Sequence, residues 1–284
     1  MVNRRRFGIL ALWLGFACQL EAERFSYKAK VVEIENLTHD TKRIRFRLVN
    51  ADGFDFTPGQ YTFFKVPDEF VTEWNARYKT THAEVARPYS FASSSSRLPS
   101  FDLMVKLAGP PPGKDVAPGL ASTYVHTRLR AGDEVRFTAP AGNLYLRKDT
   151  GRPIIIIAGG TGAAPFISLL EYWFENQLEK NNTIYFFFGV RSKRDLFLHT
   201  TFQKWAREKK NFHYIPALSS PTPEDGWQGE TGFIQMAVDK HIQARSDADA
   251  YLAGPPFMVQ EVTKVLSAKG IGKERIHHDP IVVK

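Results

Sequence analysis

The sequence predicts two domains, an antiparallel β barrel or sandwich followed by an α/β domain with a parallel sheet. Three observations predict this fold class: a chain of 284 residues that is 43% hydrophobic and 13% aromatic, short alternating strands in the first half, and uninterrupted apolar runs in the second half. A chain of this length exceeds the common size of one domain and has ample material for two buried cores.

The first half, from Phe25 to about Leu146, has the pattern of short strands. In KRIRFRLV the apolar residues Ile44, Phe46 and Leu48 alternate with arginines, which is the period-two pattern of a strand with one buried face. The runs YTFFKV, FDLMVKLA and DEVRFTAP follow, separated by turns that contain proline and glycine. This spacing is typical of an antiparallel barrel or sandwich.

The second half begins after the polar stretch RKDTGR, and its apolar residues are arranged differently along the chain. The apolar runs PIIIIAGG, TIYFFFGV, FHYIPALS and ADAYLAGP alternate with helix-like stretches. This alternation indicates a parallel sheet that is buried on both faces. We therefore expect a Rossmann-like, nucleotide-binding type of domain over residues 149–284, a barrel domain over 25–148 and a separate N-terminal segment over 1–24.

Composition excludes several kinds of site. The net charge is +8, but Arg4, Arg5 and Arg6 supply part of it and most other basic residues are interspersed with acids, so no nucleic-acid partner is expected. Cys18 is the only cysteine in this sequence, which rules out an internal disulfide and a four-cysteine iron–sulfur cluster within it. The histidines show no metal-ligand spacing, so we expect no metal site.

The N-terminal segment starts with the three arginines and continues with an uncharged, apolar stretch from Phe7 to Leu20. This stretch is short for a membrane span and suits the core of a signal peptide. Basic residues ahead of an apolar run favour an N-terminus that stays inside. A cleaved signal peptide, a retained anchor or surface helix, and a misassigned start all remain open from the segment itself.

The stretch IIIIAGGTGAAPFISLLEYW has the order strand, glycine-rich turn, helix. Gly159, Gly160 and Gly162 would let the backbone approach a diphosphate closely, and the start of the helix offers unpaired N–H groups. This pattern suits a dinucleotide. The alternative is a tight strand-to-helix turn, because the spacing is not the usual GxGxxG.

The stretch RPYS suggests contacts with a flat, phosphorylated cofactor. Arg87 can hold a phosphate, and Tyr89, two positions on along a strand, projects to the same side, where its ring could stack on the cofactor. Ser90 could then hydrogen-bond a ring nitrogen. The alternative is an edge strand with an exposed arginine.

Four elements in a fixed order carry a resemblance to a known family: RPYS, a Gly-x-x-Ser element from Gly119 to Ser122, GGTGAAP, and AGPP at 253–256. Together they resemble the ferredoxin-NADP reductase-like family of flavin and nicotinamide oxidoreductases, from Phe25 to about Asp279. Within it, the chain is similar to the flavin-binding part of the NADH-oxidising subunit of sodium-translocating NADH:quinone oxidoreductase and to reductase components of multicomponent oxygenases. Both relatives normally carry a 2Fe-2S domain ahead of the barrel, which this sequence lacks.

The resemblance implies a set of cofactor-binding residues. Arg87 would bind the FAD diphosphate, Tyr89 the isoalloxazine ring and Ser90 the N5 region, so that Tyr89 and Ser90 lie at the catalytic centre. Further FAD contacts would come from Lys106, Leu107, Ala108, Gly119, Ser122 and Thr123. Contacts with the nicotinamide dinucleotide would come from Gly160, Thr161, Gly162, Pro165, Arg191, Gly254, Pro255 and Pro256.

The chain departs from the family pattern at two places. Ala253 stands where many relatives have a cysteine. At the chain end, Asp279 or its neighbours His277 and His278 could lie near the flavin, and Pro280 stands where an aromatic residue is common. The alternative for the two histidines is a solvent-exposed strand end.

The preference between NADH and NADPH depends on the residues after the second strand of the α/β domain. The basic run from Arg191 to Arg194 lies where the adenine ribose is expected, and bases there could hold the 2′-phosphate of NADPH. Relatives with a similar Arg-Ser start use NADH. We expect NADH as the donor, with NADPH as the alternative.

The resemblance implies hydride transfer from NADH or NADPH to FAD, with electrons then passed to a separate redox protein. The alternatives are direct reduction of a quinone, free flavin or ferric chelate, and a non-catalytic flavin-binding subunit of a membrane redox complex. NAD(P)H is a cytoplasmic reductant, so we expect a membrane-associated protein with its catalytic domain on the cytoplasmic face and segment 1–24 as anchor. The alternative is a periplasmic protein after signal-peptide cleavage.

Overall fold

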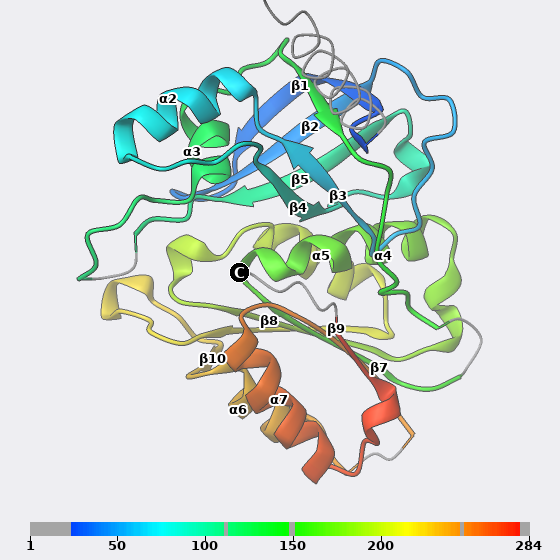
Figure 1. The fold of residues 1–284 in the computed structure, drawn as a ribbon. Helices are drawn as coiled ribbons and strands as arrows, with labels where there is room; N and C mark the ends of the chain where they lie inside the picture. Colours follow the sequence, from blue (N-terminus) through cyan, green and yellow to red (C-terminus); the bar gives the residue numbers. More distant parts are fainter. Residues whose placement is uncertain (1–23, 111–112, 148–150, 245–246, 279–284) are drawn as a thin grey trace, which may run out of the picture.

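The computed structural model describes residues 24–110, 113–147, 151–244 and 247–278, which build two sheets with their helices, one above the other in Figure 1. The predicted N-terminal segment with Cys18, and Asp279 and Pro280 at the chain end, lie outside the described residues. No helix in the described ranges combines the length and the apolar character needed to cross a membrane.

The first sheet has six antiparallel strands in the order β4-β3-β6-β1-β2-β5. Their bounds are β1 (Tyr27–Asn36), β2 (Thr41–Leu48), β3 (Tyr61–Lys65), β4 (Ala86–Ser90), β5 (Ser100–Lys106) and β6 (Glu134–Phe137). The outer strands β4 and β5 meet just beyond β4, where Phe91 and Leu103 form an antiparallel bridge and the N–H of Ala92 donates to the carbonyl of Asp102 at 2.8 Å. These contacts close the sheet into the predicted barrel.

The alternation predicted for β2 is confirmed. Ile44 and Phe46 are 0% and 1% exposed, and the Phe46 ring packs on Phe101 and Phe137 with ring centroids 5.4 and 5.1 Å apart. Aromatic pairs of this kind add about 0.5–1.5 kcal/mol each beyond the burial of their area. The arginines of the other face form ion pairs, Arg43 with Glu35 and Arg45 with Glu33 and Asp102.

Two helices, α2 (Asp68–Tyr78) and α3 (Leu120–Thr127), cover one side of the barrel (Figure 1). The strand pattern of the first half did not predict helix α2. Val71 and Trp74 of α2 are buried, and the Phe70 ring lies 5.2 Å from that of Tyr124 in α3. Phe70, Val71 and Trp74 recur with helical spacing, so burying them against the barrel favours a helix.

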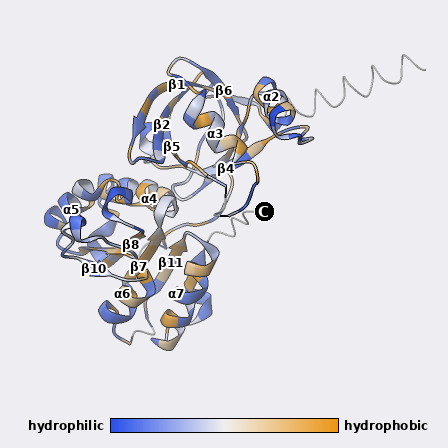
Figure 2. Cartoon of the chain, turned by 90° about the vertical axis from the view of Figure 1, so that its left-hand side faces the viewer, coloured by the Kyte–Doolittle hydropathy of each residue, from blue (hydrophilic) through white to orange (hydrophobic). Residues whose placement is uncertain are grey.

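The second sheet has six parallel strands in the order β10-β9-β8-β7-β11-β12. Their bounds are β7 (Ile154–Gly159), β8 (Ile184–Val190), β9 (Phe212–Leu218), β10 (Glu230–Thr231), β11 (Asp249–Ala253) and β12 (Ile276–His278). Residues 154–157 of β7 are at most 1% exposed, and Figure 2 shows this apolar strand inside the domain. The four predicted apolar runs therefore form strands buried on both faces, as expected.

Helices cover both faces of this sheet. Their bounds are α4 (Ala164–Glu175), α5 (His199–Glu208), α6 (Ile234–His241) and α7 (Pro256–Ala268). Residues of α4 and α5 share a core with Ile154 and Ile156, whereas α6 and α7 pack with Ile155 and Ile157 on the other face. Since β7 lies between β8 and β11, the strand order reverses there, and ligands bind such sheets outside the carboxyl ends of the strands at this switch point.

Candidate functional site

A cleft of about 710 Å³ lies between the barrel and the carboxyl ends of the parallel strands. Most of the predicted site residues line it, namely Tyr89, Ser90, Lys106, Gly160, Thr161, Gly162, Pro165, Arg191, Gly254, Pro255 and Pro256. The remaining ones, Arg87, Leu107, Ala108, Gly119, Ser122 and Thr123, are not among the lining residues but belong to adjoining parts of β4, β5 and α3. The fold thus brings both halves of the chain to one ligand-sized cleft at the switch point.

Strand β4 forms the barrel wall of the cleft. Tyr89 and Ser90 line it, and Ser90 is only 9% exposed. Arg87 is exposed, its guanidinium donates to the carbonyl of Ala86 at 2.9 Å, and the described residues give it no carboxylate partner. Arg87 therefore keeps donors free for an anion beside a strand that presents a tyrosine ring.

Burial raises the pKa of Tyr89 to about 12 from its ordinary value of 10.0, against a smaller opposing effect of Arg87. The phenol of Tyr89 should therefore stay neutral at and around neutral pH. The stability that depends on the neutral phenol is fully present below pH 10.0 and is lost as the pH rises through about 12. Comparing the tyrosinate absorbance of the wild type and Tyr89→Phe over pH checks this; a Tyr89 transition near the ordinary value would contradict it.

The start of α3 is tied to the end of β5. The N–H of Gly119 donates to the carbonyl of Ala108 at 2.7 Å, and the N–H of Ala108 donates to Ser122 Oγ at 3.1 Å. The Ser122 hydroxyl in turn donates to the carbonyl of Gly119 at 2.9 Å. Thr123 Oγ1 is buried and has no hydrogen-bond partner among the described residues, so a polar group remains to be satisfied at this helix start.

The two glycine loops of the second domain pack backbone to backbone. A Cβ on Gly162 would lie 2.3 Å from the carbonyl oxygen of Ala253, and one on Gly254 would lie 3.0 Å from the nitrogen of Gly159. Gly160, in contrast, has φ +53° and open space around its Cβ position. The two loops therefore form one surface in which Gly162 and Gly254 leave no room for a side chain, while the backbone at Gly160 stays accessible to a ligand.

The loop after β8 forms the far end of the cleft. Arg191 and Asp195 line it, and one carboxylate oxygen of Asp195 accepts from the N–H of Ser192 at 2.9 Å and from its hydroxyl at 2.6 Å. Lys193 points elsewhere, since its Nζ donates to the carbonyl of Asp225 at 2.7 Å. The predicted basic run thus contributes Arg191 together with an acidic neighbour that sequence reasoning had not singled out.

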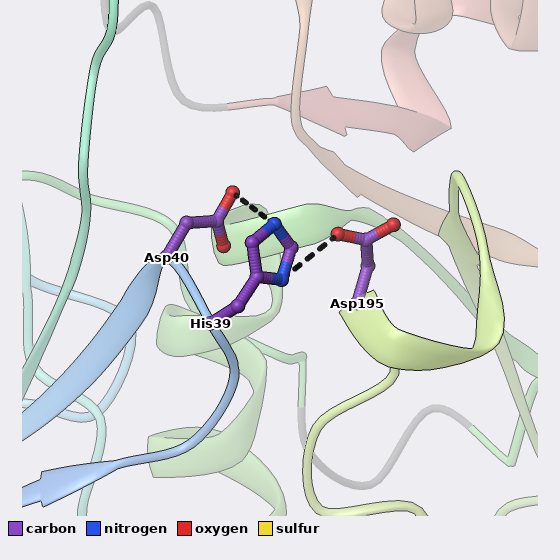
Figure 3. A group of neighbouring side chains, drawn as sticks. All are labelled: His39, Asp40 and Asp195. Atoms are coloured by element: carbon purple, nitrogen blue, oxygen red, sulfur yellow. Dashed lines mark ion pairs between the residues drawn. The ribbon is translucent and has the colours of Figure 1, made fainter.

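His39, in the turn between β1 and β2, lies between two carboxylates (Figure 3). Its Nε2 is 3.6 Å from Asp40 and its Nδ1 is 3.9 Å from Asp195. The ligand atoms of the three residues lie within 4.8 Å of one another, as a metal site would require. Asp195 is already engaged with Ser192, however, and Asp40 is paired with Lys106 at 3.1 Å.

The pKa of Asp40 also argues against a metal ion at this place. Burial alone would raise the pKa of Asp40, but hydrogen bonds and charge attraction, mainly from Lys106, outweigh it and lower the pKa. A cation at this place would compete with the Lys106 ammonium. We therefore interpret His39 as a contact between the two domains at the rim of the cleft, where its ring lies between the carboxylates of Asp40 and Asp195.

Several other residues that line the cleft were not predicted from the sequence, because they belong to none of the motifs. They include Thr41, Met104, Phe197, Ser219, Phe233, Phe257 and Met258. At the chain end, neither His277 nor His278 lines the cleft. Instead, the His277 ring packs 4.9 Å from that of Tyr251, and burial lowers the pKa of His277.

Comparisons with known proteins agree with this geometry. The family description "Oxidoreductase FAD-binding domain" matches residues 28–145, and "Oxidoreductase NAD-binding domain" matches residues 156–264. The F subunit of the Na(+)-translocating NADH-quinone reductase of Serratia proteamaculans (strain 568) is 32% identical over 275 residues, covering 89% of this chain and 67% of that relative. The chain belongs to the family of FAD- and NAD-binding oxidoreductases.

Other members of this oxidoreductase family match over a similar range. The phenol hydroxylase P5 protein of Acinetobacter pittii (strain PHEA-2) is 32% identical over 252 residues, covering 88% of this chain and 64% of that relative. The flavohem-like FAD/NAD binding domain of the Vibrio cholerae O1 biovar El Tor nitric oxide dioxygenase superposes with a TM-score of 0.70 at 27% identity, covering 89% of this chain and 97% of that one. The chain thus spans about two thirds of the length of the Serratia F subunit and of the Acinetobacter P5 protein.

As a family member, the chain carries the FAD-binding and NAD-binding domains of an FAD-dependent NAD(P)H oxidoreductase. Features of the structure fit both dinucleotides. The open backbone at Gly160 suits a diphosphate at a helix start. The Thr123 hydroxyl, buried and without a partner in the described part of the chain, lies at the start of α3.

Proposed function

We propose that this chain transfers hydride from NADH to FAD and delivers the electrons to a separate redox protein. The observation that carries the proposal is the cleft in which Tyr89 and Ser90 of the barrel lie across from the joined glycine loops of the α/β domain. FAD, when bound, supplies the redox chemistry by accepting hydride and releasing electrons singly or as a pair. The protein's task is to hold the two reactants in the right geometry.

On the barrel side, we assign three tasks to β4 and its neighbours. Arg87 would bind the FAD diphosphate, since its guanidinium is exposed and lacks a carboxylate partner in the described structure. Tyr89 would cover the flavin as a neutral ring, and Ser90 would donate its hydroxyl to the flavin edge. The tied segment from Lys106 to Ala108, with Gly119, Ser122 and Thr123, would hold the rest of the cofactor.

On the α/β side, Gly160, Thr161 and Gly162 would hold the NADH diphosphate at the start of α4, with Pro165 in the first turn of that helix. Gly254, Pro255 and Pro256 would line the nicotinamide. Ala253 is half-buried and lines the cleft, so it can pack against the ring although it lacks the thiol that many relatives have. These assignments, and the domain bounds 25–148 and 149–284, are part of the proposal.

The preference for NADH rests on Asp195. Its carboxylate lines the same end of the cleft as Arg191, where it would repel the 2′-phosphate of NADPH and could accept a ribose hydroxyl of NADH. Asp195→Asn should therefore lower the kcat/KM for NADH divided by the kcat/KM for NADPH by roughly three- to tenfold.

The chain offers a matched control for this variant. Asp225 accepts from the N–H of Thr222 at 2.9 Å in a second capping box of the same type, away from the cleft lining. Asp225→Asn should leave the donor ratio unchanged. Equal ratios in Asp195→Asn and the wild type would show that this carboxylate does not read the ribose.

The experiment that tests the proposed function is an anaerobic titration of the purified, full-length chain with NADH and separately with NADPH, followed through the flavin absorbance. Bleaching by NADH at lower concentration than by NADPH is the expected result. A flavin that neither donor bleaches would favour the non-catalytic flavin-binding role. A colourless protein that cannot be reconstituted with FAD would contradict the cofactor assignment.

A separate protein is proposed as acceptor because the solved structures similar to this chain include a ferredoxin reductase, whose name gives a second protein as its redox partner. Direct reduction of a quinone is the second candidate, since several relatives are named as subunits of an NADH-quinone reductase. Turnover of NADH with a soluble quinone as sole acceptor, at a rate matching the rate of flavin reduction, would favour the second candidate.

We propose membrane association through segment 1–24, with the catalytic domain on the cytoplasmic face where NAD(P)H is available. The stretch from Phe7 to Leu20 taken alone suits a signal peptide, and the need for NAD(P)H at the catalytic domain is the reason for proposing a short anchor instead. Fractionation of cells that carry a C-terminally tagged chain tests this assignment. Recovery of the tagged domain from the periplasm without its first residues would replace it with the cleaved signal peptide.

A further inference from the structure

A polar junction with a buried centre joins the barrel to α4. We call it the serine junction, and its members are Ser93, Ser94 and Arg97 from the barrel and Ser168, Glu171 and Glu175 from α4. The three residues of α4 recur at spacings of three and four, which places them on one face of the helix. The cleft lies at the start of the same helix, where Ala164 and Pro165 line it.

The centre of the serine junction excludes water. Ser93, Ser94 and Ser168 are each 0% exposed. The hydroxyl of Ser168 donates to the carbonyl of Ser93 at 2.7 Å, and the N–H of Ser94 donates to the carboxylate of Glu171 at 3.0 Å. The hydroxyl of Ser94 also donates to Glu175 at 2.5 Å. A buried polar group without a hydrogen-bond partner raises the free energy of the folded state. This arrangement therefore favours one relative placement of the barrel and α4 over others that would break these hydrogen bonds.

Arg97 extends the serine junction back into the barrel. Its guanidinium lies 3.0 Å from Glu171 and 3.8 Å from the buried carboxylate of Asp102, which also pairs with Arg45 at 2.9 Å. Burial raises the pKa of Glu171, and the charge of Arg97 opposes this effect. This half-buried carboxylate between the two domains is thus held by a backbone N–H and a cation, both from the barrel.

The serine junction lies close along the chain to both walls of the cleft. Ser93 is the third residue after Ser90, and Ser168 is the sixth after Gly162. One side continues from strand β4 and the other belongs to helix α4. A rotation of one domain on the other at this point would move the Gly160–Gly162 loop relative to Tyr89 and Ser90.

We propose that Ser168 and Glu171 are positioning residues for hydride transfer, setting the distance between the nicotinamide and the flavin through the serine junction. The inference rests on the proposed transfer from NADH to FAD. Reacting atoms must approach to about 3–3.5 Å, and a displacement of about 1 Å can cost on the order of a hundredfold in rate. Domains that share a modest interface move relative to each other unless something fixes them, and the serine junction supplies that fixation.

The test measures the limiting rate of flavin reduction at saturating NADH by anaerobic rapid mixing of the full-length, FAD-loaded chain. Glu171→Ala should lower this rate roughly ten- to hundredfold, with less than about a twofold change in FAD content or in the half-saturating NADH concentration. Ser168→Ala should lower it in the same sense. Glu171→Gln, which keeps an acceptor for Ser94, should recover part of the rate.

Glu73→Ala is the control, since it breaks an exposed ion pair with Arg128 at 2.8 Å on the barrel surface. It should keep the wild-type rate. A second readout does not depend on turnover: small-angle scattering without NADH should show a broader distribution of interdomain distances for Glu171→Ala than for Glu73→Ala. If Glu171→Ala does not fold, Ser168→Ala and Glu171→Gln decide the test by the same two measurements.

Wild-type limiting rates in the folded Glu171 and Ser168 variants would overturn the inference, even with lowered thermal stability, because the serine junction would then only stabilise the fold. This outcome differs from a failure of the proposed function. In that case the wild type itself would not be reduced by NADH, and the scattering comparison would still report whether the serine junction fixes the domains.

Discussion

Replacing Gly162 with alanine should reduce NADH-driven flavin reduction by on the order of a hundredfold or more while FAD stays bound. The added Cβ would lie 2.3 Å from the carbonyl oxygen and 2.6 Å from the carbonyl carbon of Ala253, and backbone atoms cannot turn aside as a side chain can. The Gly160–Gly162 loop and the Gly254 loop must then separate. Both loops are proposed to hold NADH, so the loss should appear in donor binding and in the rate of reduction together.

The measurement is flavin bleaching by NADH over a range of concentrations, with the FAD content determined from the same samples. Gly272→Ala is a fitting control in the same domain, because its Cβ would meet only the flexible carboxylate end of Glu274. It should behave like the wild type. Normal bleaching in Gly162→Ala would show that the contact between the two glycine loops does not shape the nicotinamide site.

Replacing Arg87 with alanine should weaken FAD binding roughly ten- to hundredfold, since a hydrogen bond to a charged group contributes about 1.5–3 kcal/mol. Arg87 is exposed beside Tyr89, and its guanidinium donates to the carbonyl of its chain neighbour Ala86. Its removal should therefore leave the barrel folded. Arg87→Lys should recover part of the affinity, because an ammonium still attracts a phosphate but lacks the planar fork of donors.

Flavin fluorescence during titration of the apoprotein with FAD gives the affinity, and thermal unfolding of the apoprotein shows whether the barrel is intact. Arg128→Ala removes another exposed arginine of the barrel, which pairs with Glu73, and should bind FAD as the wild type does. Equal FAD affinities for Arg87→Ala and the wild type would move the diphosphate site away from β4.

The sheets were predictable because their strands carry local patterns. The arginine alternation of β2 and the isoleucine run of β7 each indicate burial without reference to the rest of the chain. Helix α2 was not predictable in the same way, because only Val71 and Trp74 of its residues are buried and both lie among charged neighbours. The barrel surface beneath them decides that they form a helix, and this surface is assembled from strands distant in sequence.

The part of the site that was predictable from the sequence is the part formed by motif residues. The stretches around Tyr89 and Gly160 do meet at one cleft, as their common ligand pair requires. Asp195 had no motif, since an acid after three basic or polar residues has the pattern of an ordinary helix start. The four consecutive serines at 93–96 were equally uninformative about burial, because serine is mostly exposed on protein surfaces. Only the tertiary structure shows that Ser93 and Ser94 are buried.

The bridge between Phe91 and Leu103 matters for the chain before it acquires its flavin. A six-stranded sheet that stayed open would present two unpaired edges, and such edges recruit strands from other molecules. The bridge occupies backbone groups where the outer strands β4 and β5 meet, so less of the two edges is open to a neighbouring copy. We therefore expect this closure to reduce edge-to-edge association of the barrel before FAD binds.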